Sequence, residues 1–189
     1  MFEAHSAQQS QKHRKKGKDN MLRIKVNKEI KKALKHKSIF IDIEGSLTRH
    51  TLQEDLPCKP IIKAILKGDN IYIAETTYSP LDMLNKIRWL NESCPINFDG
   101  MFWFVPEDSW DMFSTEFYQV PYLVSHTTDN SIDTRYGLII KGSNPSDIIS
   151  YIMHNNELDK IAFIHSVNCF VDYAKSQGVT AYNTNDFLY

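Results

Sequence analysis

Short apolar runs alternate with amphipathic segments along most of this chain, and this alternation constrains the fold more than any other feature. The runs read SIFIDI at 38–43, NIYIAET at 70–76, GMFWFVP at 100–106 and KIAFIHS at 160–166. Between the second and third runs, residues 79–93 carry Leu81, Leu84, Ile87 and Leu90 on one helical face. Apolar strands separated by helices predict an α/β fold with a parallel sheet and crossover helices.

The same periodicity predicts the remaining elements. Helices are expected within 21–37 and over 58–68, 143–156 and 168–178, with further strands over 136–142 and 179–183. Ser79 is placed to cap the helix at 79–93, and Cys94-Pro95 is placed to end it. The stretch from 107 to 135 is less regular, and we expect a short helix or a small insertion there.

The composition is that of an ordinary globular chain. The 189 residues are 42% hydrophobic and 24% charged, and the length suits one domain. We expect this domain to span 21–189, after a polar tail at 1–20 that lacks the apolar residues needed to fold. Apolar runs stay far below the 18 or so residues of a membrane-spanning helix, so no membrane association is expected.

Charge is divided unevenly between the two ends of the sequence. Residues 1–37 hold 12 Lys/Arg and 3 Asp/Glu, whereas residues 38–189 hold 10 and 20. A basic segment can neutralise phosphate groups, so residues 12–37 are a candidate contact for nucleic acid. The alternative is a solvated tail without a partner.

The cysteines indicate the compartment. Cys58, Cys94 and Cys169 are far apart, and no Cys/His spacing typical of a metal site is present. We interpret them as reduced thiols, and we therefore expect a cytoplasmic protein.

Several polar residues fall at or just after the ends of predicted strands. In open parallel sheets the ligand sits beyond the carboxyl ends of the strands, so such residues can gather in one site. The residues in these positions are Asp42, Glu44, Thr76, Lys141, His165 and Ser166.

These residue types suit phosphoryl transfer. A carboxylate such as Asp42 can attack phosphorus and form an aspartyl-phosphate. The Thr76 hydroxyl, the Lys141 ammonium and backbone N–H groups of the 44–46 turn could hold the phosphoryl oxygens. Glu44 could protonate the leaving alkoxide and later activate water.

The order of these segments resembles the haloacid dehalogenase superfamily. FIDIEGSLT resembles the first motif of that family, DxDGT(L/V), and IYIAETT resembles the second, an apolar strand that ends in Ser/Thr. The RWL segment at 88–90, one helix later, resembles a feature of the nucleotidase and polynucleotide-phosphatase branches. IIKGSNPSDIISYI resembles the third motif, and KIAFIHSVNCFVDYAKSQGVTAYN the fourth. The resemblance covers roughly residues 37–185.

The resemblance implies a Rossmannoid three-layer fold with a mainly parallel sheet and little or no cap. It implies a phosphomonoesterase that acts through an aspartyl-phosphate, with nucleotides or nucleic-acid ends as candidate substrates. Asp42 would be the nucleophile and a Mg²⁺ ligand, Glu44 the general acid/base, and Lys141 the cation that steadies the intermediate. The phosphoryl group would be bound by Thr76, with Thr77 as a second choice, and by the turn at Gly45 and Ser46.

Two departures from the family pattern bear on this function. Glu44 stands where the family has Asp, and the longer side chain displaces the carboxyl group. His165 and Ser166 stand where the family supplies aspartates for Mg²⁺, which leaves Asp42 and His165 as metal ligands. The alternative function is therefore a catalytically degenerate protein with a binding or regulatory role, with nucleic acid as the candidate partner of its basic segment.

Each candidate residue also has a structural interpretation. Asp42 and Glu44 could be turn residues, Thr76 could bond within the sheet end, Lys141 could be solvated, and a lone histidine such as His165 is more often structural. Aromatic residues could stack on bases, but their periodicity favours core packing for Trp89, Phe102, Trp103 and Phe104.

Overall fold

A computed structural model describes residues 27–50, 55–118 and 124–187, so the tail expected at 1–20 lies outside the described residues. The described residues form one eight-stranded sheet and a separate two-stranded hairpin. In spatial order the sheet contains β10 (Thr180–Asn183), β9 (Ile161–His165), β1 (Ser38–Ile41), β4 (Asn70–Thr76), β5 (Gly100–Val105), β8 (Gly137–Lys141), β7 (Ser131–Thr134) and β6 (Val124–Thr127).

Most of this sheet is parallel, as the alternating sequence pattern predicts. The six strands from β10 to β8 pair in parallel, and β7 and β6 then extend the sheet in antiparallel fashion. The molecule is therefore an α/β protein with a Rossmann-like fold. The strands predicted over 38–43, 70–76, 100–106, 136–142, 160–166 and 179–183 are confirmed to within one or two residues.

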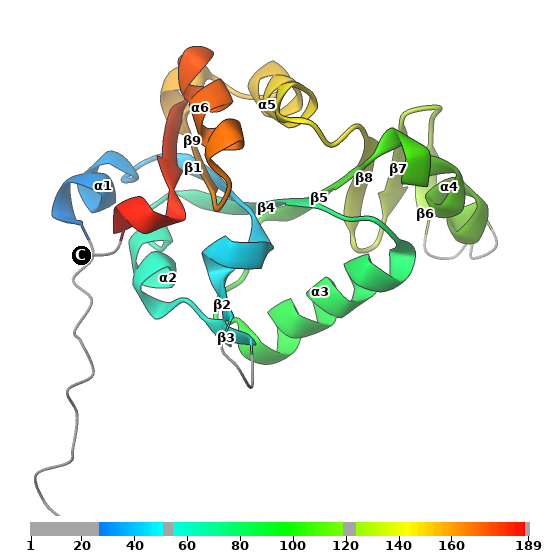
Figure 1. The fold of residues 1–189 in the computed structure, drawn as a ribbon, viewed down its shortest axis with the longest axis horizontal. Coiled ribbons are helices and arrows are strands. Elements are labelled where there is room, and N and C mark those ends of the chain that lie inside the picture. Colours follow the sequence, from blue (N-terminus) through cyan, green and yellow to red (C-terminus); the bar gives the residue numbers. More distant parts are fainter. Residues whose placement is uncertain (1–26, 51–54, 119–123, 188–189) are drawn as a thin grey trace, which may run out of the picture.

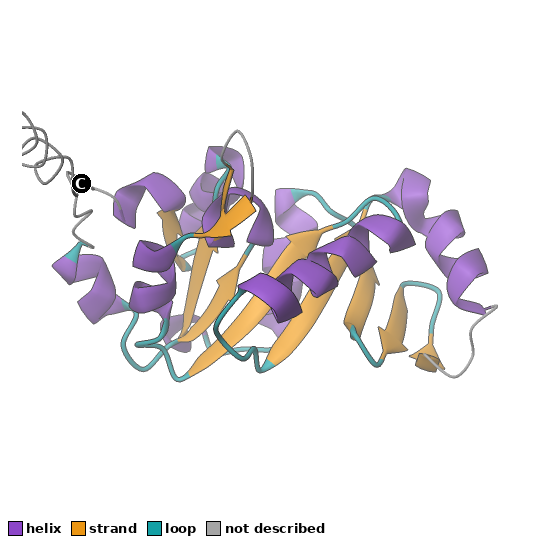
Figure 2. Cartoon of the chain, turned by 90° about the horizontal axis from the view of Figure 1, so that it is seen from below, coloured by secondary structure: helices purple, strands orange, loops and turns teal. Residues whose placement is uncertain are grey.

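Helices cover both faces of the sheet, which gives three layers (Figures 1 and 2). Figure 1 shows α5 and α6 on one face and α2 and α3 on the other. None of the described helices is both long and apolar enough to cross a membrane. The helices are α1 (Lys28–Ala33), α2 (Lys59–Ile65), α3 (Pro80–Ser93), α4 (Trp110–Tyr118), α5 (Pro145–His154) and α6 (Asn168–Ser176), with short turns η1 (Ile43–Leu47), η2 (Glu107–Ser109), η4 (Leu158–Lys160) and η5 (Thr184–Phe187).

Each face of the sheet buries its own apolar core. On one face, residues of α1 to α4 pack against the sheet around Trp103, Phe113 and Ile41. On the other, Ile148 and Ile152 of α5 pack with residues of α6 around Phe163. Because both faces are covered, the central strands are apolar throughout, which explains why they appear in the sequence as continuous runs.

Side chains at the helix starts act as the sequence predicts. Ser79 accepts a hydrogen bond from the N–H of Asp82 at the start of α3, and Cys94 ends this helix. Asn144 caps α5 in a capping box with Asp147. These contacts fix where the chain leaves β4 and β8, at the edge where the candidate residues lie.

The irregular stretch from 107 to 135 is an addition to one end of the sheet. It contains η2, α4, β6 and β7, and Trp110, Phe113 and Phe117 of α4 are buried. The expectation of a short helix or small insertion is confirmed for the described part of this stretch. Residues 119–123 of this stretch lie outside the described residues.

The strand order reverses beside β1. From β1 the chain adds β4, β5 and β8 on one side, then returns to place β9 and β10 on the other. Ligands bind open α/β sheets at such a switch point, outside the carboxyl ends of the strands. Asp42 directly follows β1 and His165 ends β9, so the fold brings both to this point.

Candidate functional site

Asp42 lies at the switch point as a buried carboxyl group. Its side chain is 3% exposed, and its backbone N–H donates to the Ile164 carbonyl of β9 (3.3 Å). Ser166 donates to Asp42 Oδ2 from its backbone N–H (3.2 Å) and from its hydroxyl (2.7 Å). Asp42 Oδ1 is buried and has no hydrogen-bond partner among the described residues.

This burial changes the acidity of Asp42. Loss of solvation raises its pKa from 3.8 to about 7, because a carboxylate is poorly stabilised away from water. The Ser46 and Ser166 hydroxyl groups lower the pKa by a smaller amount. Asp42 therefore holds a proton for much of the time near neutral pH.

The hydrogen bonds of Ser166 agree with a protonated Asp42. Ser166 Oγ lies 2.7 Å from Asp42 Oδ2 and 2.9 Å from the Glu44 carbonyl oxygen, yet a serine hydroxyl has one hydrogen to donate. When Asp42 is ionised, the two acceptors compete for that hydrogen. When Asp42 Oδ2 carries a proton it can donate to Ser166, and Ser166 can then donate to Glu44.

Gly45 allows the turn after Asp42 to lie against Ser166. Its φ is +82°, and a Cβ atom at this position would lie 2.7 Å from Ser166 Cβ. The Gly45 N–H donates to Thr48 Oγ1 (3.2 Å), and the neighbouring Ser46 hydroxyl bonds to Thr184 Oγ1 (2.8 Å). The polar groups that were predicted to bind phosphate at Gly45 and Ser46 therefore have partners within the protein.

His165 is buried beside Asp42 but is not ionised. Burial lowers the pKa of its imidazole to about 4, and its ring stacks on Phe170 with centroids 4.2 Å apart. His165 Nδ1 accepts a hydrogen bond from the Val167 N–H (3.0 Å). The 3.6 Å separation between Nδ1 and Asp42 Oδ2 is therefore not an ion pair, because the imidazole is neutral.

A second buried carboxyl group, Glu75 of β4, faces the turn after Asp42. Its side chain is 4% exposed, and its Oε2 accepts from the backbone N–H groups of Ile43 (2.5 Å) and Glu44 (3.4 Å). Burial raises the pKa of Glu75 to about 7, against the effect of the Lys86 ammonium, and the nearby charge of Asp42 raises it further. The loop that follows β1 is thus already bound to a carboxyl group of the chain itself.

Lys86 of α3 supplies the positive charge opposite Glu75. Its Nζ donates to Glu75 Oε1 (2.9 Å) and to the Thr76 carbonyl oxygen (2.8 Å), and it is 7% exposed. Asp82 Oδ2 lies 3.2 Å away and Glu44 Oε1 3.6 Å away. Burial alone would lower the pKa of Lys86, but the charge and hydrogen bond of Glu75 outweigh it and raise the pKa, so Lys86 stays protonated.

Neither Glu75 nor Lys86 was among the candidate residues from the sequence, although both left a signal there. Glu75 is a charged residue inside the apolar run of β4, which is fully covered on both faces. Lys86 lies at helical spacing from Met83 and Leu90, on the buried face of α3. A charge in a core position needs a partner, so two such positions on adjacent elements predict an ion pair.

The predicted acid/base residue Glu44 and the predicted phosphate-binding residues Thr76 and Thr77 lie in different surroundings. The Glu44 side chain is 60% exposed and approaches Lys86, whereas Thr76 contributes its carbonyl oxygen to the same ammonium group. Thr77 is fully buried, and its hydroxyl donates to Asp82 Oδ2 (2.8 Å) and lies 3.3 Å from the Ser79 carbonyl oxygen. The Thr77 side chain therefore holds the start of α3.

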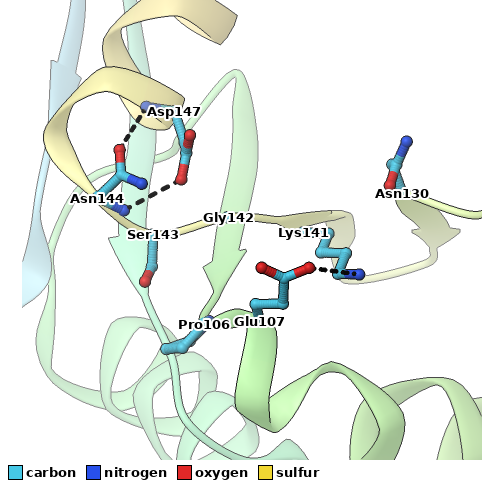
Figure 3. Close-up of a pocket in the computed structure, with 8 residues that line it drawn as sticks. All are labelled: Pro106, Glu107, Asn130, Lys141, Gly142, Ser143, Asn144 and Asp147. Carbon is cyan, nitrogen blue, oxygen red and sulfur yellow. Dashed lines mark hydrogen bonds and ion pairs between the residues drawn. The ribbon is translucent and has the colours of Figure 1, made fainter.

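Lys141 lies apart from these residues. It ends β8, the third strand from β1, so about 14 Å of sheet separates the two strands at about 4.8 Å per strand. Its Nζ pairs with Glu107 Oε1 at 3.1 Å (Figure 3). This pair lies in a polar pocket of about 320 Å³ lined by Pro106, Glu107, Asn130, Lys141, Gly142, Ser143, Asn144 and Asp147.

The residues present do not fit the Mg²⁺ ion that the family resemblance implies. Within the described ranges, no three His, Cys, Asp or Glu side chains are grouped to hold a metal ion. Asp42 Oδ1 is available, but Nδ1 of His165 already accepts a backbone hydrogen bond and Glu75 binds Lys86. Mg²⁺ is usually held by one or two carboxylates together with several waters in octahedral geometry, whereas the available oxygen of Asp42 is buried within the protein.

Comparisons with known proteins return no relative: no family model, no curated protein and no solved structure matches this chain. A fold alone does not determine a function, since one architecture serves many activities. A functional proposal for this chain therefore rests on the contacts of its own residues.

Proposed function

We propose that this chain is a catalytically degenerate protein on a haloacid dehalogenase-like fold, and that it binds nucleic acid instead of hydrolysing a phosphate ester. One observation carries the proposal. The Glu75 carboxyl group accepts the backbone N–H groups of Ile43 and Glu44, directly after Asp42.

These two N–H groups are where a phosphoryl oxygen would need donors. If Asp42 attacked a phosphorus atom, oxygens of that group would lie beside the turn that begins at Ile43, because successive N–H groups of a turn form an anion-binding concavity. Glu75 already accepts both, and its second oxygen binds Lys86. A phosphate would have to displace the carboxyl group and face its negative charge.

The state of Asp42 supports the same conclusion. A carboxyl group attacks phosphorus only when it is ionised, and burial raises the pKa of Asp42 to about 7. Of the two neighbouring carboxyl groups, Glu75 has an ammonium partner and Asp42 has none among the described residues. Burial raises the pKa of both carboxyl groups to about 7, and ionisation of one opposes ionisation of the other, so near neutral pH the pair retains a proton.

The position of Asp42 in the fold supports the family resemblance. The surroundings of the other candidate residues do not support the family's chemistry. Asp42 follows β1 at the switch point of a Rossmann-like sheet, next to Ser166 from the end of β9. The second carboxylate of the first motif is replaced by the exposed Glu44, and Lys141 forms a pair with Glu107 in a separate pocket. The position of Asp42 agrees with the resemblance, while the groups that would act with it are not assembled around it.

The binding role is supported by the distribution of charge. Residues 12–37 carry twelve Lys/Arg and two Asp/Glu. In the described part of this segment, Lys28, Lys32 and Lys35 have exposed side chains. Lysines that neutralise backbone phosphates bind nucleic acid with little dependence on base sequence.

Hydrolysis assays test the non-catalytic part of the proposal. The purified full-length chain would be incubated with p-nitrophenyl phosphate, nucleotides and 3′-phosphorylated DNA, with Mg²⁺ or with EDTA, beside Asp42→Asn. We expect equal background rates for both proteins at high enzyme concentration. Mg²⁺-dependent hydrolysis that disappears in Asp42→Asn would overturn the proposal.

The second candidate function is a phosphomonoesterase, and one observation favours it. Asp42 Oδ1 is a buried acceptor without a partner among the described residues, so one oxygen is available to a reacting group. This function requires Glu75 to leave the N–H groups of Ile43 and Glu44 when a substrate arrives. In the same assay, it predicts hydrolysis that rises as pH passes 7 and Asp42 ionises.

A further inference from the structure

Lysines from a second, sequence-distant element lie beside the basic segment. The segments 27–37 and 58–69 together hold eight lysines and two acidic residues. The rest of residues 38–189 holds seven Lys/Arg and nineteen Asp/Glu. Positive charge in the folded part is therefore concentrated in α1, α2 and the turns that follow them.

Contacts join these two helices at their C-terminal ends. The Asp69 N–H donates to the Lys37 carbonyl oxygen (2.9 Å), and the His36 ring lies 3.3 Å from Asp69 Oδ1. A Cβ atom on Gly68 would lie 2.8 Å from the Lys37 carbonyl oxygen, so the two turns touch. Figure 1 shows α1 and α2 at the same end of the molecule, opposite the end formed by α4 and β6.

The apolar faces of both helices are buried, which leaves their lysines at the surface. Ile30 and Leu34 of the α1 segment and Ile61 and Ile65 of α2 are all in the core. The exposed lysines on the same segments are Lys28, Lys32, Lys35, Lys59, Lys63 and Lys67, which we call the six-lysine face. No acidic side chain of the described ranges forms an ion pair with any of the six.

Helix stability does not explain this arrangement. Lysines near a helix C-terminus favour the helix dipole, but Lys28 and Lys59 are the first residues of α1 and α2. A cation at a helix N-terminus is unfavourable, and the first turn of α2 has no acidic residue. The spacing of Lys59 and Lys63, four residues apart, places them on one side of α2 about 6 Å apart along its axis.

We propose that the six-lysine face binds the phosphate backbone of nucleic acid. This deepens the proposed function, because it adds Lys59, Lys63 and Lys67 of α2 to a contact that the sequence placed within 12–37 alone. The acidic end of the molecule, with exposed Glu107, Asp108, Asp111 and Glu116, repels phosphate and orients the approach.

A nucleic acid fits this surface better than an anionic membrane. A helix that lies in a membrane interface inserts an apolar face, whereas the apolar faces of α1 and α2 are buried in the core. Leu66, 53% exposed, is the one large apolar side chain that is exposed on the described residues of 27–37 and 58–69. Phosphate neutralisation needs charge without insertion, which is what these lysines provide.

The test compares three full-length variants with the wild type by fluorescence anisotropy on a labelled 20-mer DNA duplex, over a series of salt concentrations. Lys59→Gln/Lys63→Gln/Lys67→Gln removes the α2 part of the face. Arg88→Gln/Arg135→Gln/Lys175→Gln removes the same charge from exposed positions elsewhere and serves as the matched control. Arg14→Gln/Lys15→Gln/Lys16→Gln weakens the basic segment.

We expect the α2 variant to lose affinity about tenfold or more and to reduce the slope of log K against log salt by about 2 to 3, because each phosphate contact contributes about 0.9. The control variant should match the wild type. If the α2 variant keeps the wild-type affinity and salt slope, and only the Arg14/Lys15/Lys16 variant loses affinity, this inference is overturned. The proposed function would then still stand. Absence of DNA binding by the wild type would overturn both.

Vesicles of phosphatidylcholine and phosphatidylserine provide the competing surface. We expect no binding of the wild type to these vesicles at a salt concentration where the duplex is bound. Vesicle binding that depends on the α2 lysines, without an effect of these lysines on duplex binding, would contradict the nucleic-acid assignment. Circular dichroism of each variant establishes that the fold is intact.

Discussion

Glu75 Oε1 lies 2.9 Å from Lys86 Nζ, and both side chains are buried where the turn after Asp42 meets β4 and α3. A buried pair of this kind costs solvation of both ions, so each partner depends on the other. The pair also fixes the turn, because Glu75 accepts the N–H groups of Ile43 and Glu44. It gives the candidate site an internal anion and an internal cation.

Lys86→Met is expected to lower the free energy of unfolding by about 3–5 kcal/mol at pH 8, because it leaves the ionised Glu75 buried without a counter-charge. Urea denaturation measures the change. The double variant Glu75→Gln/Lys86→Met removes both charges, and it should lose much less than the sum of the two single variants. A Lys86→Met protein within about 1 kcal/mol of the wild type would show that the pair does not hold the site.

Sequence reasoning predicted the α/β fold and part of the site, for identifiable physical reasons. Strands covered on both faces are apolar throughout, so β1, β4, β5 and β9 were visible as runs. The switch-point rule brought Asp42 together with His165 and Ser166.

The rest of the site could not be predicted in this way, because it depends on the order of the strands and on contacts between different elements. Strand order decides which strand ends are neighbours, and β8 lies beyond β5, so Lys141 pairs with Glu107 far from Asp42. The Glu75–Lys86 pair was missed because each residue was considered within its own element. Its signal is a charge in a core position on each of two adjacent elements.

Asp42→Asn is expected to change how stability depends on pH. The pKa of Asp42 is about 7 in the folded chain and 3.8 as a free group, so the folded state binds the extra proton between about pH 4 and pH 7. The stability that the folded state gains from this extra proton is fully present below pH 4 and is lost as pH rises through 7. The stability of Asp42→Asn relative to the wild type should therefore increase from pH 5 to pH 8, by an amount on the order of 1–4 kcal/mol.

Urea denaturation of the two proteins at several pH values measures this difference. His165 titrates in both proteins, so the subtraction removes its effect. The charge of Asp42 raises the pKa of Glu75, so Asp42→Asn lowers that pKa, which increases the difference in the same direction. A difference in unfolding free energy that stays constant between pH 5 and pH 8 would mean that the pKa of Asp42 is not raised.

His165 is expected to remain neutral down to about pH 5. Burial lowers the pKa of its imidazole from 6.5 to about 4, so its stabilising contribution is present above pH 6.5 and is lost as pH falls through 4. NMR titration of the imidazole C–H resonances measures this, with His165→Gln to assign the signal. A midpoint near 6.5 for the assigned resonance would indicate a charged His165 in contact with Asp42.

Gly45→Ala is expected to destabilise the fold by about 2–4 kcal/mol, because it combines a left-handed backbone with a close contact to Ser166. Gly178→Ala is the matched control: its φ is +83°, close to the +82° of Gly45, and a Cβ atom there meets nothing within 4 Å. The control should lose only about 1 kcal/mol.

The Gly45→Ala/Ser166→Gly double variant identifies the contact. It should recover part of the loss, since the 2.7 Å approach between the new Cβ and Ser166 Cβ disappears. Equal losses in Gly45→Ala and Gly178→Ala, by thermal or urea denaturation, would mean that the turn does not lie tightly against Ser166.

The central claim is that Glu75 already fills the anion position of the turn after Asp42. The most direct test is a titration of inorganic phosphate into the ¹⁵N-labelled chain at pH 8, with the amide signals of Ile43 and Glu44 followed by NMR. In the wild type these signals should not move at millimolar phosphate, whereas in a folded Glu75→Ala protein they should shift as phosphate takes the place of the carboxylate. Saturable shifts of both amides in the wild type would contradict the claim and would favour the phosphomonoesterase.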